Sequence, residues 1–188
     1  KLWNAARFCQ MNDCAAPPEF DPAACAVTAN RWIVGEATRT AERVTAEIEA
    51  YRFNEAAGAL YQFAWGTFCD WYLEAIKPVL AGPDGAEKDE TRAAAAWVLD
   101  TLLHLLHPIM PFLTEELWQE LGARGNAILA TSPWPELGEE LVDAAAAAEM
   151  DWVIRLVGQV RTVRAEMNVP AGVRVPATLT GASAENQD

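Results

Sequence analysis

Apolar residues recur every three or four positions through most of this chain, which is the pattern of amphipathic helices packed on one another. The clearest stripe runs through Ile33, Ala37, Ala41, Val44, Ile48 and Tyr51. Its steps of four, four, three, four and three residues keep these side chains on one face of a helix. The segment 28–51 is therefore predicted to be an amphipathic helix, with Thr28 or Asn30 as its N-cap.

The same periodicity predicts further helices at 1–12, about 54–77, 89–107, 114–122 and 139–167. The proline-containing segments 13–27 and 123–137 are predicted to be ordered loops between them. The short run 173–179 has the alternation of a strand. The expected fold is all-α, a bundle of about five or six helices over 1–168. Residues 169–188 are expected to begin a small, truncated α/β subdomain.

The formal net charge of −13 argues against a protein that binds nucleic acid over its whole surface, because phosphate contacts need Lys and Arg. The charge is unevenly distributed, however. Residues 1–52 carry six basic and seven acidic side chains, whereas residues 53–188 carry eight and twenty. In 152–175, four arginines are opposed by Glu166 alone. Two regions therefore escape the acidic bias and are candidates for local contact with RNA.

Trp32 is predicted to lie on the polar face of the helix 28–51. At about 100° per residue, Trp32 falls about 100° from Arg31, between Arg39 at about 80° and Arg43 at about 120°. An unpaired base can stack on an indole while neighbouring guanidinium groups hold its phosphates. The alternative is that Trp32 packs on the loop 13–27 as a cover near the helix start.

The opening helix carries a second candidate site. Asn4 and Arg7 lie one turn apart on its polar strip. Arg can pair with a phosphate or a base edge, and Asn offers a donor and an acceptor to a base. The alternative is that both side chains satisfy backbone groups of the loop that follows.

Other classes of function find little support in the residues. The four cysteines form no CxxC pair, so no metal site is expected, although a zinc site from Cys14, Cys25, His104 and His107 is conceivable. Free thiols indicate a reducing, cytoplasmic setting. No apolar run approaches the roughly 20 residues of a membrane span. There is no glycine-rich phosphate loop and no catalytic triad order, so no catalytic residue is assigned.

Short motifs are spread over nearly the whole chain. They are KLWNAARF at 1–8, DWYLE at 70–74 with Lys77-Pro78, HPIMPF at 107–112, TEELW at 114–118, Trp134-Pro135 and RAEMNVP at 164–170. Together they resemble the anticodon-binding helical bundle of class I aminoacyl-tRNA synthetases. FCDWYLE combined with HPIMPFLTEELW is similar to the valyl-tRNA synthetases rather than to their isoleucyl or leucyl relatives.

The resemblance implies that the chain, which lacks an initiator Met, is a fragment of a longer enzyme. The parent would attach valine to its tRNA with ATP and Mg²⁺, using motifs that lie before Lys1. This fragment would need no cofactor and would bind the anticodon stem-loop of valine tRNA beside the remaining domains of a monomeric enzyme. The resemblance and the helix projection together give the expected RNA contacts as Asn4, Arg7, Phe8, Arg31, Trp32, Arg39 and Arg43. The alternatives are the same module of the isoleucine or leucine enzyme and a helical protein-interaction module.

Overall fold

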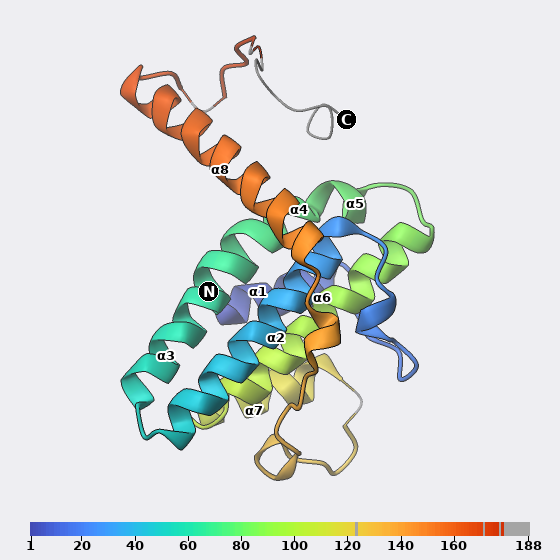
Figure 1. The fold of residues 1–188 in the computed structure, drawn as a ribbon. Coiled ribbons are helices and arrows are strands. Elements are labelled where there is room, and N and C mark those ends of the chain that lie inside the picture. Colours follow the sequence, from blue (N-terminus) through green and yellow to red (C-terminus); the bar gives the residue numbers. More distant parts are fainter. Residues whose placement is uncertain (123, 171, 177, 179–188) are drawn as a thin grey trace. The chain divides into compact units, whose positions relative to one another are not determined.

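The computed structural model describes residues 1–122, 124–170, 172–176 and 178 (Figure 1). Every regular element in these ranges is helical, which confirms the all-α prediction. The α-helices are α1 (Leu2–Met11), α2 (Thr28–Glu49), α3 (Phe53–Tyr61), α4 (Leu73–Ala75), α5 (Lys77–Ala81), α6 (Ala86–Leu106), α7 (Pro111–Leu121) and α8 (Ala144–Glu166). Single 3-10 turns are η1 (Pro22–Ala24), η3 (Leu129–Thr131) and η4 (Glu139–Leu141), and η2 (Gln62–Tyr72) is a π-helix.

The chain divides into two compact units, Lys1–Trp152 and Val153–Asp188. In the first unit, α2 packs against α3 and α6 (Figure 1), while α1 packs against α6 and α7. Ile33 and Val44 of α2 are fully buried, as are Val98 and Leu102 of α6. Removing each such side chain from water contributes about 1.5–3 kcal/mol before the entropy of ordering is subtracted. The predicted apolar stripe therefore faces the core from Ile33 to Val44, whereas Tyr51 at its end lies beyond α2 and is 82% exposed.

The prediction of one α-helix over 54–77 is wrong between Gln62 and Tyr72, where the backbone is π-helical. Hydrogen bonding to the residue five positions back widens each turn, so that residues five apart come to the same side. Phe63 and Phe68 are spaced in this way and both are buried. The helical path also continues beyond 77, because Pro78 lies in the first turn of α5, where no backbone donor is needed.

Three helices end in the same backbone motif. A non-glycine residue takes a left-handed conformation after each helix: Asp13 (φ 55°), Tyr51 (φ 60°) and Asn168 (φ 51°). The next N–H then donates to the carbonyl five residues earlier, from Cys14 to Cys9 (2.9 Å), Arg52 to Glu47 (2.8 Å) and Val169 to Arg164 (2.9 Å). This is the Schellman cap, in which the side chains at the two ends of that hydrogen bond come into contact.

The predicted strand at 173–179 is not found in its described part, residues 173–176 and 178, and residues 177 and 179 lie outside the described ranges. In this second unit, Arg164 instead holds the chain that follows α8, since its Nη2 atom donates to the carbonyls of Pro170 (2.8 Å) and Val173 (2.9 Å). The domain boundary at residue 168 stays a prediction.

Two predicted helix starts are also corrected. Thr114 lies inside α7 rather than capping it, and its hydroxyl donates to the carbonyl of Met110 at 3.0 Å. α8 begins at Ala144 rather than near residue 139, where η4 forms a separate turn. Within the described ranges, no helix combines the length and apolar character that crossing a bilayer needs.

Candidate nucleic-acid interface

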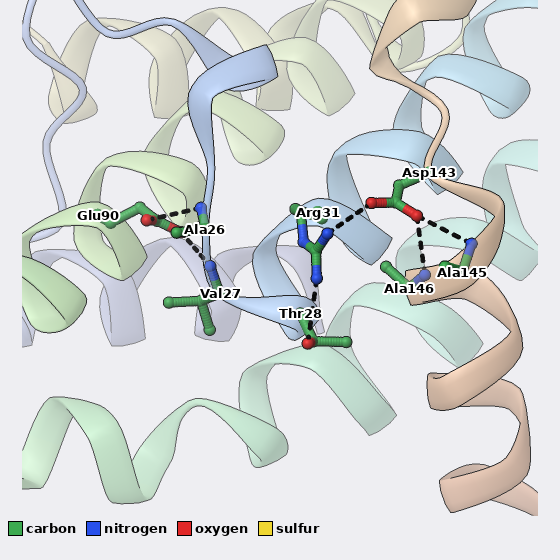
Figure 2. Close-up of polar contacts among 8 residues, drawn as sticks. All are labelled: Ala26, Val27, Thr28, Arg31, Glu90, Asp143, Ala145 and Ala146. Atoms are coloured by element: carbon green, nitrogen blue, oxygen red, sulfur yellow. Dashed lines mark hydrogen bonds and ion pairs between the residues drawn. The ribbon is translucent and has the colours of Figure 1, made fainter. Parts of the chain in front are cut away.

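The segment that leads into α2 is held by another helix. The carboxylate of Glu90, on α6, accepts the backbone N–H groups of Ala26 (2.9 Å) and Val27 (3.0 Å) (Figure 2). The sequence predicted Thr28 or Asn30 as the N-cap, but neither residue caps the helix. Thr28 is the first residue of α2 and Asn30 lies inside it. The two N–H groups that lead into α2 are thus satisfied by a tertiary contact.

Asn30 is instead the centre of a buried polar network. Its Nδ2 atom donates to Glu90 Oε1 at 2.9 Å and to Thr91 Oγ1 at 3.1 Å. Its Oδ1 atom accepts the hydroxyl of Tyr72 at 2.9 Å. Burial raises the pKa of Tyr72 well above its usual value, so the phenol stays protonated and remains a donor. The network fixes α2, η2 and α6 against one another.

Arg31 is held by the start of α8. Its Nη1 atom lies 2.8 Å from Oδ2 of Asp143, whose Oδ1 accepts the N–H groups of Ala145 and Ala146, each at 2.9 Å (Figure 2). The hydrogen bond from the Ala146 backbone, together with the charge of Arg31, lowers the pKa of Asp143. Arg31 therefore joins two helix starts and does not stand free for a ligand.

The prediction that Trp32 stands on an exposed polar face is wrong. Its side chain is only 5% exposed. The segment that leads into α8 covers this side of α2, since a Cβ at Gly35 would lie 3.4 Å from the carbonyl oxygen of Leu141 and 3.5 Å from Cα of Val142. Periodicity within α2 gave no sign that residues 139–143 return to pack against this helix.

Arg39 and Arg43 are both exposed on α2. Nη1 of Arg39 pairs with Oε1 of Glu36 at 2.6 Å, one turn away. For Arg43, the described part of the chain provides no hydrogen bond or ion pair. Exposed pairs of this kind are worth little, so either guanidinium can exchange its surroundings for a phosphate at small cost.

On α1, Asn4 and Arg7 are exposed and Phe8 is half-buried. Asn4 and Phe8 line one groove of about 270 Å³, together with Leu73 and Lys77. Arg7 has no hydrogen bond or ion pair among the described residues. The structure thus brings Asn4 and Phe8 to a common groove, whereas the predicted contacts on α1 and those on α2 form two separate groups. No hydrogen bond or ion pair links the two groups within the described ranges.

An aromatic surface that was not predicted lies beside the first turn of α1. The rings of Tyr61 and Trp65 stack with centroids 5.4 Å apart, and Nζ of Lys1 sits 4.3 Å from the centroid of Trp65. Trp3, 47% exposed, lines the same groove of about 350 Å³. The available sequence signal was the four-residue spacing of Tyr61 and Trp65, because residues four apart share a helix face. Exposed aromatic rings beside a cation favour stacking of an unpaired base.

The histidines are held by local partners. Nδ1 of His104 lies 2.8 Å from the carbonyl oxygen of Asp100, and Nδ1 of His107 lies 2.8 Å from Oγ1 of Thr114. In the described ranges, no group of three or more His, Cys, Asp or Glu side chains is placed to hold a metal ion. The conceivable zinc site from two cysteines and these histidines is therefore not assembled.

Comparison with known proteins decides the family. Residues 30–179 match the family model described as the anticodon-binding domain of tRNA ligase. The chain belongs to this family. Its relatives include the valine–tRNA ligase of Caulobacter vibrioides, 51% identical over 190 residues, which cover 100% of this chain and 21% of that protein. The valine–tRNA ligase of Brucella suis biovar 1 is 50% identical over 186 residues, covering 97% of the chain and 20% of that protein.

The anticodon-binding segment described here thus spans about a fifth of the length of these relatives. A solved structure gives a second likeness. It is the LeuRS of Agrobacterium radiobacter K84 in a ternary complex with tRNA and LeuAMS, with a TM-score of 0.54 and 26% sequence identity. The match covers 76% of this chain and 16% of that one. The helical bundle is therefore shared with a synthetase that was solved with tRNA bound.

Proposed function

We propose that this chain is the anticodon-binding part of a valine–tRNA ligase and binds the anticodon stem-loop of valine tRNA. The observation that carries the proposal is the 51% identity to the Caulobacter vibrioides valine–tRNA ligase, which extends over the whole chain. The full-length parent attaches valine to its tRNA with ATP and Mg²⁺ in regions outside this segment. The segment itself holds RNA and makes or breaks no bond.

The RNA contacts are assigned to side chains that can reach a ligand. Arg7 and Arg43 are exposed and have no ion-pair partner among the described residues, so each can take a phosphate. Asn4 and Phe8 share a groove in which an amide can read a base edge and a ring can stack. Arg39 adds a cation next to Arg43 on α2.

Arg31 and Trp32 are assigned positioning roles in the same proposal. Arg31 is paired with Asp143, and Trp32 is almost fully buried. Both residues stabilise the start of α2 and thereby the helix that carries Arg39 and Arg43. Their substitution would weaken RNA binding through a loss of helix position rather than a loss of contact.

The acidic composition sharpens the electrostatic argument. With a net charge of −13, the chain as a whole repels RNA, so binding must depend on a few local cations. Each phosphate contact that is removed should reduce the slope of log K against log salt by about 0.7 for single-stranded RNA. A single arginine substitution is therefore measurable as a change in slope as well as in affinity.

The test is fluorescence anisotropy with a labelled valine anticodon stem-loop at several salt concentrations. We expect preference over a loop with an altered anticodon, and we expect Arg7→Ala to lower affinity and reduce the salt slope. Arg52→Ala is the matched control, because Arg52 is an exposed arginine already paired with Glu47 and outside the proposed contacts.

Two outcomes would overturn the proposal. Equal binding of both loops would show that the chain does not recognise the anticodon. Tighter binding of a leucine or isoleucine stem-loop would show that the parent is a leucine or isoleucine enzyme. An Arg7→Ala variant with unchanged affinity and salt slope would remove α1 from the contact surface.

A further inference from the structure

Two cysteines face each other across the C-terminal cap of α1. The left-handed Asp13 turns the chain so that the N–H of Cys14 donates to the carbonyl of Cys9 at 2.9 Å. In a Schellman cap, the side chains at these two positions are frequently in contact. The Cys9 thiol is accordingly close enough to act on the Cys14 sulfur as a hydrogen-bond donor, which shifts the pKa of both groups.

The cap of α2 shows independently what this backbone motif does to the paired side chains. There Tyr51 is the left-handed residue, and Arg52 and Glu47 occupy the positions that Cys14 and Cys9 occupy in α1. Their side chains meet in an ion pair. The same backbone motif thus brings two side chains together in α2, and in α1 it places two cysteines at these positions.

The cysteine pair is open to a small reagent. Cys9 and Cys14 both line a cavity of about 160 Å³, and Cys14 is the more accessible of the two at 9% exposed, against 1% for Cys9. Arg92 lies beside the same turn, where its Nε atom donates to the carbonyl of Asn12 at 2.9 Å. A molecule of a few atoms can thus reach Cys14 next to a fixed positive charge.

The two thiols differ in acidity. The hydrogen bond from Cys9 lowers the pKa of Cys14, and the charge of Arg92 acts in the same direction, against burial and the charge of Asp13. The same hydrogen bond, with burial, raises the pKa of Cys9. Because the thiolate is the reactive form, Cys14 is suited to attack an oxidant and Cys9 to remain a thiol beside it.

We propose that Cys9 and Cys14 form a peroxide-sensitive dithiol that closes to a disulfide at the end of α1. The Cys14 thiolate attacks one oxygen of hydrogen peroxide, the O–O bond breaks, and the leaving hydroxide takes up a proton as water. Cys14 is then a sulfenic acid. The Cys9 sulfur attacks the Cys14 sulfur, the S–O bond breaks, the hydroxyl leaves with the Cys9 proton as a second water, and the S–S bond forms. Two thiols lose two electrons, and one peroxide is reduced to two waters.

The chain offers two matched controls. Burial, with the nearby carboxylate of Glu90, raises the pKa of Cys25 to about 12, and burial likewise raises the pKa of Cys69. Neither residue occupies a helix cap with a second cysteine. Both should therefore react with peroxide much more slowly than Cys14.

The experiment treats the reduced chain with equimolar hydrogen peroxide, stops the reaction with catalase and alkylates the remaining thiols. Cleavage before Asp13, Asp21 and Asp70 places Cys9 in peptide 1–12, Cys14 in 13–20, and Cys25 with Cys69 in 21–69. We expect peptides 1–12 and 13–20 to be joined by a disulfide and 21–69 to carry two alkyl groups. Oxygen added to Met11 is distinguished because it leaves the alkylation count unchanged.

Variants test the assignment of roles. Cys14→Ser should slow thiol loss at least about tenfold, whereas Cys25→Ser and Cys69→Ser should leave it unchanged. Cys9→Ala should leave Cys14 as a sulfenic acid that dimedone traps in peptide 13–20, which keeps the test valid if Cys14→Ser fails to fold. A disulfide from Cys9 to peptide 21–69, or equal oxidation of all four thiols, would overturn the proposal.

Discussion

Nη1 of Arg31 lies 2.8 Å from Oδ2 of Asp143, although the two residues are 112 positions apart in the chain. The other oxygen of the same carboxylate caps α8 through the N–H groups of Ala145 and Ala146. One side chain thus fixes the beginning of two helices. This relationship explains why an arginine that the sequence offers as an RNA ligand is occupied within the protein.

Replacing Asp143 by Ala should lower the thermal midpoint, because α8 loses its cap and Arg31 its partner. The hydrogen bond from Ala146, with the charge of Arg31, lowers the pKa of Asp143 in the folded state. Its contribution is therefore complete above the unfolded value of about 4 and is lost as pH falls through the lower folded value.

Thermal melts of both proteins at pH 7 and pH 3 check this. The difference in midpoint between wild type and Asp143→Ala should be large at neutral pH and shrink in acid. Glu42→Ala, an exposed carboxylate on α2, is the control. An equal difference in thermal midpoint at both pH values would show that the charge of Asp143 does not contribute to stability.

Trp32→Ala should reduce the free energy of unfolding by about 3–5 kcal/mol, because it empties the space of a buried indole. Trp3→Ala removes a ring that is already 47% exposed, and it should cost much less. Urea unfolding of the two variants gives the comparison. A Trp32→Ala chain that kept wild-type stability yet lost RNA binding would show that the indole contacts RNA directly after all.

Tyr72→Phe should cost about 1–3 kcal/mol of unfolding free energy, since the fully buried Oδ1 atom of Asn30 loses its donor and no water replaces it. Tyr61→Phe is the matched control, because that ring is 63% exposed and its hydroxyl can bond to solvent. Chemical denaturation of both variants distinguishes a buried hydrogen bond from a simple loss of the hydroxyl. Equal small effects would mean that Asn30 finds another partner.

Arg43→Ala should weaken binding of the anticodon stem-loop and reduce the salt slope by about 0.7. The physical reason is the removal of one exposed guanidinium from the α2 surface. Arg39→Ala should lower affinity more at low salt. It removes a cation and also leaves the carboxylate of Glu36 without its partner, so that this negative charge repels the RNA phosphates. Anisotropy titrations over a salt series measure both. Unchanged slopes in the two variants would place the RNA elsewhere.

Tyr51→Gly should raise the free energy of unfolding by about 1 kcal/mol, because the left-handed conformation costs a residue with a Cβ about 1–2 kcal/mol and glycine almost nothing. Tyr51 is 82% exposed, so little packing is lost. Ala46→Gly, inside α2, is the opposite control and should cost about 1 kcal/mol. Denaturant midpoints, compared between variants that have equal m-values, show whether each substitution raises or lowers the free energy of unfolding.

Local periodicity was enough to predict the helical class and the buried face of α2. The stripe that contains Ile33, Ala37 and Val44 has one consistent period, and all three side chains are buried. Such a pattern is intrinsic to the segment, because burial of one face of a helix requires apolar residues at that spacing.

The failures came from information that lies elsewhere in the chain. Trp32 was assigned to an exposed face because residues 141 and 142, which pack on α2 beside Gly35, are more than a hundred positions away. The π-helix over 62–72 changes the number of residues per turn, so a projection at the α-helical angle assigns faces wrongly there. The aromatic surface of Tyr61 and Trp65 was missed for another reason, because its cation, Lys1, comes from a separate helix.

The carboxylate of Glu90 also bears on the order in which the fold assembles. The first turn of α2 has no side-chain cap, and the N–H groups of Ala26 and Val27 just before it depend on a side chain more than sixty residues away. Local helix formation can therefore precede the docking of α6 in the body of α2 but not at its start. Closure of so long a loop is slow compared with helix growth. The N–H groups of Ala26 and Val27 should become protected from hydrogen exchange only when α6 has docked, so they report on the last steps of assembly rather than the first.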